Sequence, residues 1–384
     1  MSTTDDYPRF SDAEMARRRS ILAALADEAD VVDLLLYGAD RTGAAVQWAV
    51  QWPVTREAAV LWSGGDPILF VQFANHLDNA RALAKAEVRW GGHATMETVA
   101  EELRARYPAG VGRLGVLGPL PASALPALAD IGAEPVFLER AFQRARYVKS
   151  DEELEWTHRA AALTDDAMAV LASRAAVGMT ETELGALVEQ AYVPYGATNH
   201  IHYFAVTAME HPSVRVPAQW PSQRRLCPGD VVVCEISANW WGYTGQVLRT
   251  FTVEAPPTPR YAELHAVATA AFEAVLARVR AGTTGRELAE AAHLIEEAGF
   301  ATCDDIVHGY VGGYFPPVVP GEGRPGRHDD FVLEAGMTVV VQPNVVAPDG
   351  SAGVQTGELV LVTDAGHEPL HRFARGLGRI GSAK

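Results

Sequence analysis

The sequence predicts an α+β protein in which an α/β domain precedes a second domain made of two similar halves. Two internal repeats indicate the halves. Segment 226–235 (LCPGDVVVCE) returns as 333–342 (LEAGMTVVVQ), each with a leucine, a glycine three residues later, a β-branched run and a polar residue at its end. Segment 178–184 (GMTETEL) returns as 282–288 (GTTGREL), and both copies are typical of a capping box that starts a helix. We infer that a helix-plus-strand unit is duplicated.

Length, charge and cysteine content set the class of protein. A chain of 384 residues is long for one core and suggests two domains. With 48 acidic and 32 basic residues the net charge is -16, which disfavours a nucleic-acid partner. The cysteines have no paired spacing, the start of the chain is acidic, and no apolar run approaches the roughly 20 residues of a membrane span. We expect a cytoplasmic protein without a membrane contact.

The first domain alternates helical and extended patterns. Such alternation is typical of βαβ units. The expected helices are 14–26, 75–85 and 96–107, and the expected strands are 31–36, 58–62, 67–71 and 113–117.

The second domain begins near 144–150 with a long helix to about 176, capped by Ser150 with Glu153 three residues later. A second helix and strands follow, and then helices 259–281 and 284–298 and further strands. This order predicts two αα-ββ halves that pack their helices outside a curved antiparallel sheet. Segments 212–228 and 314–327 are rich in Pro and Gly, and we expect both to be loops beside the site.

Polar residues cluster at equivalent places of the two halves, where apolar strands end. Most of them are uncharged. They are His200, His202, His211, Glu235, Tyr243, Gln246 and Arg249 in the first half, and Asp304, Asp305, His308, Tyr310, Gln342, Gln355 and Glu358 in the second.

The order of these motifs resembles the pita-bread family of methionine aminopeptidase, aminopeptidase P, prolidase and creatinase. The shared order is a Pro-Gly-Asp strand, a Gly-Tyr...Arg-Thr strand, His-Gly, a Gly-Met strand and a Gly-Val...Glu strand. The part before it resembles the creatinase-type N-terminal α/β domain. The resemblance implies an N-terminal domain at 1–145 and a pita-bread catalytic domain at 146–384.

In metal-dependent members of this family two aspartates, one histidine and two glutamates hold a pair of divalent ions. The resemblance places these positions on Glu235, Gln246, His308, Gln342 and Gly357, so three of the five have lost their charge. Two divalent ions need several anionic oxygen ligands to offset their charge. We therefore expect no metal at the site and no other cofactor.

Creatinase is the family's precedent for chemistry without metal, and His211 matches the position of its histidine base. This resemblance predicts a metal-independent, creatinase-like hydrolase that acts on an amide, amidine or amino-acid-derived C–N bond of a small molecule. His211 would be the base, His308 the acid or oxyanion-stabilising group, and Glu235 their orienting carboxylate. The expected substrate-binding residues are Gln246, Gln342, Tyr243, His202, Tyr310, Glu358 and Arg249.

Other hypotheses remain open on the same residues. The pocket could serve a lyase that eliminates from a small carbonyl substrate, or an inactive binding module. It could also serve an Xaa-Pro-type metallopeptidase in which Glu235, His308 and Glu358 bind one ion. Arg249 could instead pair with a buried carboxylate, and the histidine and tyrosine side chains could be structural. By analogy with the family we expect a homodimer, in which segment 41–56 of the partner closes the site.

Overall fold

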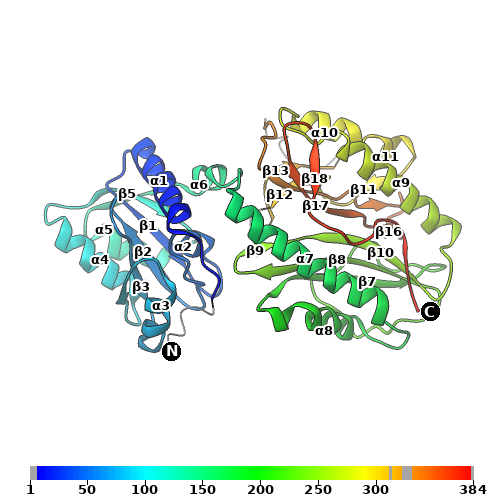
Figure 1. Cartoon of the computed structure of the whole chain (residues 1–384), viewed down its shortest axis with the longest axis horizontal. Coiled ribbons are helices and arrows are strands. Elements are labelled where there is room, and N and C mark those ends of the chain that lie inside the picture. The colour runs from blue at the N-terminus through cyan, green and yellow to red at the C-terminus, as the bar shows by residue number, and fades with distance from the viewer. Residues whose placement is uncertain (1–6, 311–313, 322–330, 382–384) are drawn as a thin grey trace. The chain divides into compact units, whose positions relative to one another are not determined.

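The computed structural model describes residues 7–310, 314–321 and 331–381 (Figure 1). The chain divides into two compact units, Met1–Arg146 and Tyr147–Lys384. Within the described residues, no helix is both long and apolar enough to cross a membrane.

The first unit is a six-stranded mixed sheet with helices. Its strand order is β4-β3-β2-β1-β5-β6, in which β1, β5 and β6 are parallel neighbours and β2 is antiparallel to both β1 and β3. The strands are β1 (Asp33–Gly38), β2 (Ala58–Trp62), β3 (Ile68–Val71), β4 (Glu87–Trp90), β5 (Gly112–Leu117) and β6 (Ala133–Phe137). The helices are α1 (Asp12–Ala29), α2 (Ala44–Val50), α3 (Leu77–Leu83), α4 (Thr95–Arg106), α5 (Leu125–Ala129) and α6 (Glu139–Ala145).

Segment 41–56, expected to be a loop that closes a partner's site, contains helix α2. Its two tryptophans are buried in their own unit, and Trp48 packs edge-on against Phe142 with ring centroids 5.3 Å apart. Trp48 and Trp52 are therefore core residues of the first unit. To contact a partner subunit, either indole would have to lose this burial.

Helices of the second unit begin where the sequence predicts them. Complete capping boxes start α7 at Ser150, α8 at Thr180 and α10 at Thr284, and each N-cap contributes about 1 kcal/mol. The expected helix 284–298 is divided at His293, whose N–H bonds to the Glu290 carbonyl three residues back and tightens the turn. The helices are α7 (Asp151–Arg174), α8 (Glu181–Tyr192), α9 (Pro259–Leu276), α10 (Gly285–Ala292) and α11 (Leu294–Glu297).

The sheet of the second unit follows the order β13-β12-β14-β17-β10-β8-β7. The two repeat strands, β8 and β14, flank the central β10–β17 pair: β8 is next to β10, and β14 is next to β17. Apart from the parallel pairing of β19 with β10, the ladders are antiparallel. The strands are β7 (Thr198–Ala208), β8 (Asp230–Trp240), β9 (Tyr243–Thr244), β10 (Val247–Val253), β12 (Val307–Tyr310), β13 (Tyr314–Val319), β14 (Thr338–Val341), β17 (Gly357–Val362), β18 (His367–Pro369) and β19 (Gly378–Ile380), with β11 (Ala301–Thr302), β15 (Val345–Val346) and β16 (Gly353–Val354) in a small third sheet.

Segment 314–327 was expected to be a loop, but its first part is strand β13, which pairs with β12. Pro316 and Pro317 are tolerated because β13 is an edge strand, where a missing N–H breaks no ladder on the outer side. Residues 322–327 lie outside the described part of the chain.

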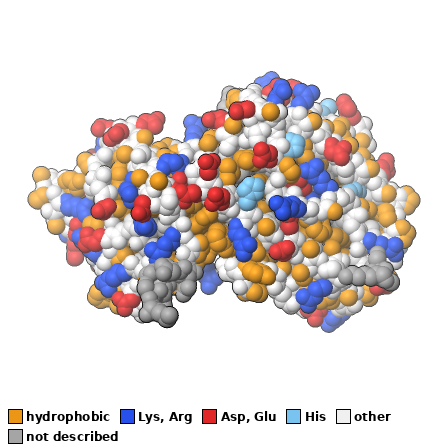
Figure 2. All heavy atoms as spheres, in the orientation of Figure 1, with side chains coloured by type: hydrophobic (Ala, Val, Ile, Leu, Met, Phe, Trp, Pro, Cys, Tyr) orange, Lys and Arg blue, Asp and Glu red, His pale blue; other side chains and the backbone are white. Residues whose placement is uncertain are grey.

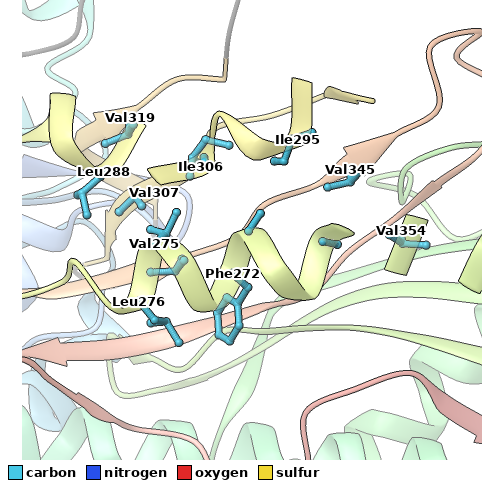
Figure 3. Packing of buried hydrophobic residues seen from close by; sticks show 14 of the residues in the cluster. Phe272, Val275, Leu276, Leu288, Ile295, Ile306, Val307, Val319, Val345 and Val354 are labelled. Atoms are coloured by element: carbon cyan, nitrogen blue, oxygen red, sulfur yellow. The ribbon is translucent and has the colours of Figure 1, made fainter. Parts of the chain in front are cut away.

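Two apolar clusters attach the helices to the sheet. Phe272, Val275 and Leu276 of α9 pack with Leu288 of α10 and with strand residues such as Val307 (Figure 3). A second cluster joins α7 and α8 to β8 and β10. With the helices held in this way, the polar residues at the strand ends gather near the β10–β17 pair.

Gly245, in the connection between β9 and β10, allows α7 to approach the sheet. A Cβ at this position would lie 2.4 Å from Ala161 Cα, and the Gly245 carbonyl accepts a hydrogen bond from Thr164 Oγ1 of α7. We expect Gly245→Ala to lower the free energy of unfolding by about 1–3 kcal/mol because backbone must move to relieve the overlap.

Urea unfolding monitored by circular dichroism measures this effect. Gly185→Ala is the matched control, since Gly185 lies inside α8 with nothing within 4 Å of the added Cβ; it should raise stability by about 0.5–1 kcal/mol. Equal effects of the two substitutions would contradict the close approach of α7.

Candidate functional site

Four strands bring together Glu235, Gln246, His308 and Gln342, which we call the central cluster. Glu235 lies on β8, Gln246 precedes β10, His308 lies on β12 and Gln342 follows β14. Gln246 Nε2 donates to Glu235 Oε1 at 2.5 Å and lies 3.4 Å from Gln342 Oε1, and His308 Nε2 is 3.3 Å from the same oxygen. The equivalent residues of the two sequence repeats, Glu235 and Gln342, are thus linked through Gln246. The sequence predicted that both repeat strands end at these residues, but Glu235 lies in the middle of β8, which continues to Trp240 because it pairs with β7 and β9 beyond this point.

Burial sets the charge of Glu235. Gln246, His308 and Gln342 are no more than 2% exposed, and Glu235 is partly buried beside them. Desolvation raises the pKa of Glu235 to about 8. The negative charge of Asp304 adds to this increase, while hydrogen bonds from Gln355 and Gln246 oppose it. Glu235 is therefore mostly protonated at neutral pH.

His308 is held in one tautomer. Its Nδ1 lies 2.9 Å from the Gly309 carbonyl oxygen, which can only accept, so Nδ1 carries the hydrogen. Burial lowers the pKa of His308, so the ring is neutral and Nε2 keeps its lone pair.

Tyr310 packs beside the imidazole ring of His308. Its ring centroid lies 5.6 Å from that of His308 and 6.1 Å from that of His200. Ser237 Oγ donates to the Gly245 carbonyl, so the Tyr310 hydroxyl, 2.7 Å away, donates to Ser237. Sequence reasoning did not single out Ser237; its position two residues after Glu235, on the same face of β8, was the available signal.

Two residues expected to bind substrate attach helices instead. The Tyr243 hydroxyl donates to Glu153 Oε1 of α7 at 2.8 Å. His202 Nε2 lies 2.6 Å from the hydroxyl of Tyr192 on α8, and desolvation lowers the pKa of His202 to about 4. Both side chains are buried. These contacts explain Tyr243 and His202 as structural residues, and neither contact involves the central cluster.

His211, expected to be the catalytic base, is exposed on the segment that follows β7. None of the hydrogen bonds described for residues 7–310, 314–321 and 331–381 joins it to the central cluster. The structure therefore brings together His308 and Glu235 of the three expected catalytic residues.

Glu358 and Arg249 form a buried ion pair. Arg249 Nη2 is 2.7 Å from Glu358 Oε2, Arg375 Nη2 is 2.6 Å from Glu358 Oε1, and Arg249 also donates to the carbonyls of Gly357 and Ala374. Both carboxylate oxygens of Glu358 are thus engaged by arginines. Glu358 therefore forms ion pairs in the position where it was expected to complete a metal site with Glu235 and His308. The alternative that Arg249 pairs with a buried carboxylate describes the structure.

The donor set does not fit a pair of metal ions. The described residues include no group of three or more His, Cys, Asp or Glu side chains that could hold a metal ion. The central cluster offers one carboxylate and one imidazole. At Gly357 a Cβ would lie 2.5 Å from the Val341 carbonyl oxygen, so the backbone leaves no room there for a ligand side chain.

Residues 155–364 match the family model of metallopeptidase family M24. The chain belongs to this family. The matched residues include both repeat halves and every member of the central cluster. The resemblance to the pita-bread family is therefore confirmed.

Curated M24 relatives include an Xaa-Pro dipeptidase of Pyrococcus furiosus, 27% identical over 233 residues that make up 60% of this chain and 65% of the relative. A probable dipeptidase PepE of Mycobacterium tuberculosis is 29% identical over 259 residues, 64% of each chain. The match thus spans less than two thirds of these relatives.

Solved structures confirm the fold class of this M24 protein. A prolidase from Pyrococcus horikoshii has a TM-score of 0.80 at 21% identity and covers 94% of this chain and 99% of its own. An Xaa-Pro dipeptidase from Bacillus anthracis has a TM-score of 0.80 at 23% identity and covers 95% and 100%. The α/β first unit and the curled antiparallel sheet of the second unit agree with these structures.

The comparisons overturn one expectation from the sequence. A metal-independent, creatinase-like enzyme acting on a non-peptide C–N bond was expected, but the family is one of metallopeptidases and the relatives named above are dipeptidases. Loss of charge at three ligand positions is a property of individual residues, whereas the family match rests on more than two hundred positions. The creatinase-like hypothesis is therefore wrong.

The Arg249–Glu358 pair gives a stability prediction. Glu358→Gln should lower the free energy of unfolding by about 3–5 kcal/mol because it leaves the buried Arg249 guanidinium without its counter-charge. Guanidinium chloride unfolding measures the loss. Glu368→Gln on the exposed face of β18 is the control and should change stability by less than about 0.5 kcal/mol; similar values for both would contradict a buried ion pair.

Glu235 gives a pH prediction. The carboxyl ionises near its ordinary value of 4.5 when unfolded and near 8 when folded, so between these pH values the folded state binds more protons. Stability should fall as pH rises through this window, and Glu235→Gln should remove that loss. Between pH 5.5 and 8 the stability of the wild type relative to Glu235→Gln should drop by about 3 kcal/mol.

Urea unfolding of both proteins at several pH values measures this difference. The comparison with Glu235→Gln cancels the titration of groups that both proteins share. A constant difference across the pH range would show that Glu235 is ionised throughout.

Proposed function

We propose that the protein hydrolyses small peptides, and that dipeptides with proline in the second position are the substrate class to test first. Membership of metallopeptidase family M24 carries the proposal, because the family match covers the two halves whose strand ends form the central cluster. The Xaa-Pro dipeptidases among its relatives support the choice of substrate.

The chemistry available in the cluster suits this reaction. Peptide hydrolysis requires a proton acceptor for water and a proton donor for the leaving amine. Glu235, with a pKa of about 8, can both hold and release a proton near neutral pH. Gln246 and Gln342 offer amide donors and acceptors that match those of a peptide group. The imidazole ring of neutral His308 is held in place by the hydrogen bond from its Nδ1–H to the Gly309 carbonyl.

The surface is consistent with a small substrate and not with a polyanion. The net charge is -16, and Figure 2 shows acidic and basic side chains mixed over the face that it draws. A mixed surface gives no extended positive field for a phosphate backbone. We retain the prediction that the protein has no nucleic-acid partner.

We also retain two predictions from the sequence, a homodimer, which the family resemblance implies, and a cytoplasmic location, which the composition favours. Because Trp48 and Trp52 are buried in their own unit, any contact of segment 41–56 with a partner would use its other side chains. Light scattering on the purified protein would establish the mass of the assembly.

A test of the hydrolase proposal combines substrates, ions and variants. Xaa-Pro dipeptides and matched Xaa-Ala dipeptides would be incubated with protein in Mn²⁺, in Zn²⁺ and in EDTA, and products would be quantified by chromatography. We expect release of proline, and a fall in kcat/KM of about 10²–10⁴-fold in Glu235→Gln, the range of general acid–base catalysis. Glu368→Gln, which alters an exposed carboxylate on β18, should retain wild-type kcat/KM.

Failure to cleave any dipeptide under all three conditions would contradict the proposal. Equal activity of wild type and Glu235→Gln would place the chemistry elsewhere.

A second candidate function is peptide binding without turnover. The observation that favours it is the composition of the central cluster, in which two glutamines and the closed position at Gly357 occupy places that the family uses for charged ligands. Saturable binding of a dipeptide together with no product in any condition would favour this candidate.

A further inference from the structure

A groove in the first unit runs between helix α4 on one side and helix α5, with the short 3₁₀ helix Ala122–Ala124 before it, on the other (Figure 1). Its volume is about 590 Å³, within the range of small-molecule sites. All residues that line it belong to the first unit, whereas the central cluster belongs to the second. The groove therefore has no part in the proposed hydrolysis.

The base of the groove is apolar. Met96 and Ala100 of α4 and Ala124 of the 3₁₀ helix form it, and the same side chains belong to the core that attaches α4 and α5 to the sheet. Pro126 and Ala127 of α5 continue this apolar surface up one wall, where Pro126 is exposed and Ala127 is half-buried. A base supported by a packed core favours a ligand that can cover it with aliphatic carbon.

Carboxylates line the rim above this base. Glu97 and Glu101 of α4 and Asp130 after α5 are exposed there, and the half-buried Glu57 is a fourth lining carboxylate. Among the described residues that line the groove, Arg104 is the one with a permanent positive charge. Four carboxylates and one guanidinium give the lining a formal charge of -3, which favours a cation.

The two rim carboxylates of α4 have no counter-charge of their own. In the part of the chain that the structure describes, no ion pair involves Glu97 or Glu101, whereas Glu102 of the same helix is paired with both Arg89 and Arg106. Glu97 and Glu101 are one helical turn apart, roughly 6 Å, and like charges at this spacing destabilise a helix. A cation bound along this side of α4 would remove the repulsion.

Charge and shape together select the class of ligand. A hard metal ion needs several oxygen ligands close together, and the described residues include no group of three or more His, Cys, Asp or Glu side chains that could hold one. A linear polyamine instead carries its ammonium groups three or four methylene groups apart, a span comparable to one helical turn. Its charges can therefore follow the carboxylates of α4 while its methylene groups cover the apolar base.

We propose that the groove between α4 and α5 binds a linear aliphatic polyamine. Ammonium groups lie at Glu97 and Glu101, and the methylene chain lies over Met96 and Ala127. Arg104 competes with the ligand for these carboxylates, because it is three residues beyond Glu101 on the same helix. The site is a binding site in addition to the proposed hydrolase, and neither depends on the other.

The test is calorimetric titration of the full-length protein with spermidine. We expect saturation by one equivalent. The diamine in which a methylene group replaces the central nitrogen of spermidine has the same length and one charge fewer, and it should bind about two- to fivefold more weakly, the effect of one exposed ion pair. Trilysine, which has the same net charge as spermidine, should bind more weakly because its peptide backbone does not fit the apolar base.

A pair of double variants separates the groove from the general negative charge of the protein. Glu97→Gln combined with Glu101→Gln should weaken spermidine about three- to thirtyfold, since two exposed ion pairs are lost. Asp27→Asn combined with Glu28→Gln is the matched control. It removes two exposed carboxylates of α1, which does not line the groove, and should change the affinity by less than about twofold.

Two single variants test the groove in other ways. Arg104→Gln removes the competing cation and should tighten spermidine about two- to fivefold. Ser123→Trp places an indole at the exposed edge of the groove without changing its charge, and it should weaken spermidine about fivefold or more by filling the space of the methylene chain. Circular dichroism would confirm that each variant is folded.

Four results would overturn the polyamine site. They are equal effects of the two double variants, which would show that spermidine responds to net charge alone; no saturation up to millimolar spermidine; full displacement of spermidine by an equal concentration of Mg²⁺, which would show a diffuse cation atmosphere; and tighter binding of trilysine, which would identify a basic peptide as the occupant.

Discussion

The pairing of β10 with β17 joins the two halves of the second unit, and the central cluster depends on it. The ladder is short, with Val247 opposite Glu358 and Leu248 opposite Gly357. Arg249 reinforces it by donating to the Gly357 carbonyl and pairing with Glu358 across the junction. Gln355 lies just before β17, whereas Glu235 lies on β8, which pairs with β10. A shift of one residue in the β10–β17 pairing would therefore separate Gln355 from Glu235.

Close backbone packing at the junction limits which side chains it can carry. A side chain at residue 357 would collide with the Val341 carbonyl and with Gln342. Glu358, the next residue, has both oxygens bound by Arg249 and Arg375. Arg249 also donates to the Ala374 carbonyl, so these contacts hold the segment at Ala374 and Arg375 against the sheet. Glu235 is thus the carboxyl group within the central cluster, and Asp304 acts on it through its negative charge.

Family membership supports the type of reaction, and the composition of the central cluster limits the chemical groups that can bind there. Membership of M24 reflects the sequence over both halves and supports peptide hydrolysis. The composition of the cluster reflects four or five positions and determines which groups the pocket can hold. A set of neutral amides around one protonated carboxyl offers a ligand both donors and acceptors of hydrogen bonds.

Local patterns were sufficient for most of the fold. The three capping boxes, the two repeats and the β-branched runs act over ten residues or fewer, so the sequence by itself determined where the main helices and strands begin and that the second unit is duplicated. It also placed polar residues at the ends of the repeat strands. The short strands β4 and β6 were not predicted, because partly exposed edge strands carry no apolar run.

Only the tertiary structure decided which polar residues meet. Arg249 and Glu358 are 109 residues apart in the chain, and Tyr243 and Glu153 are 90 apart. Contacts at such separations depend on strand order and on how closely α7 approaches the sheet, neither of which has a local signal. The same long-range packing left Gly357 without space for a side chain, exposed His211, and placed Gln355 beside Glu235, because a side chain's partner is set by the neighbouring strand and not by its neighbours in sequence.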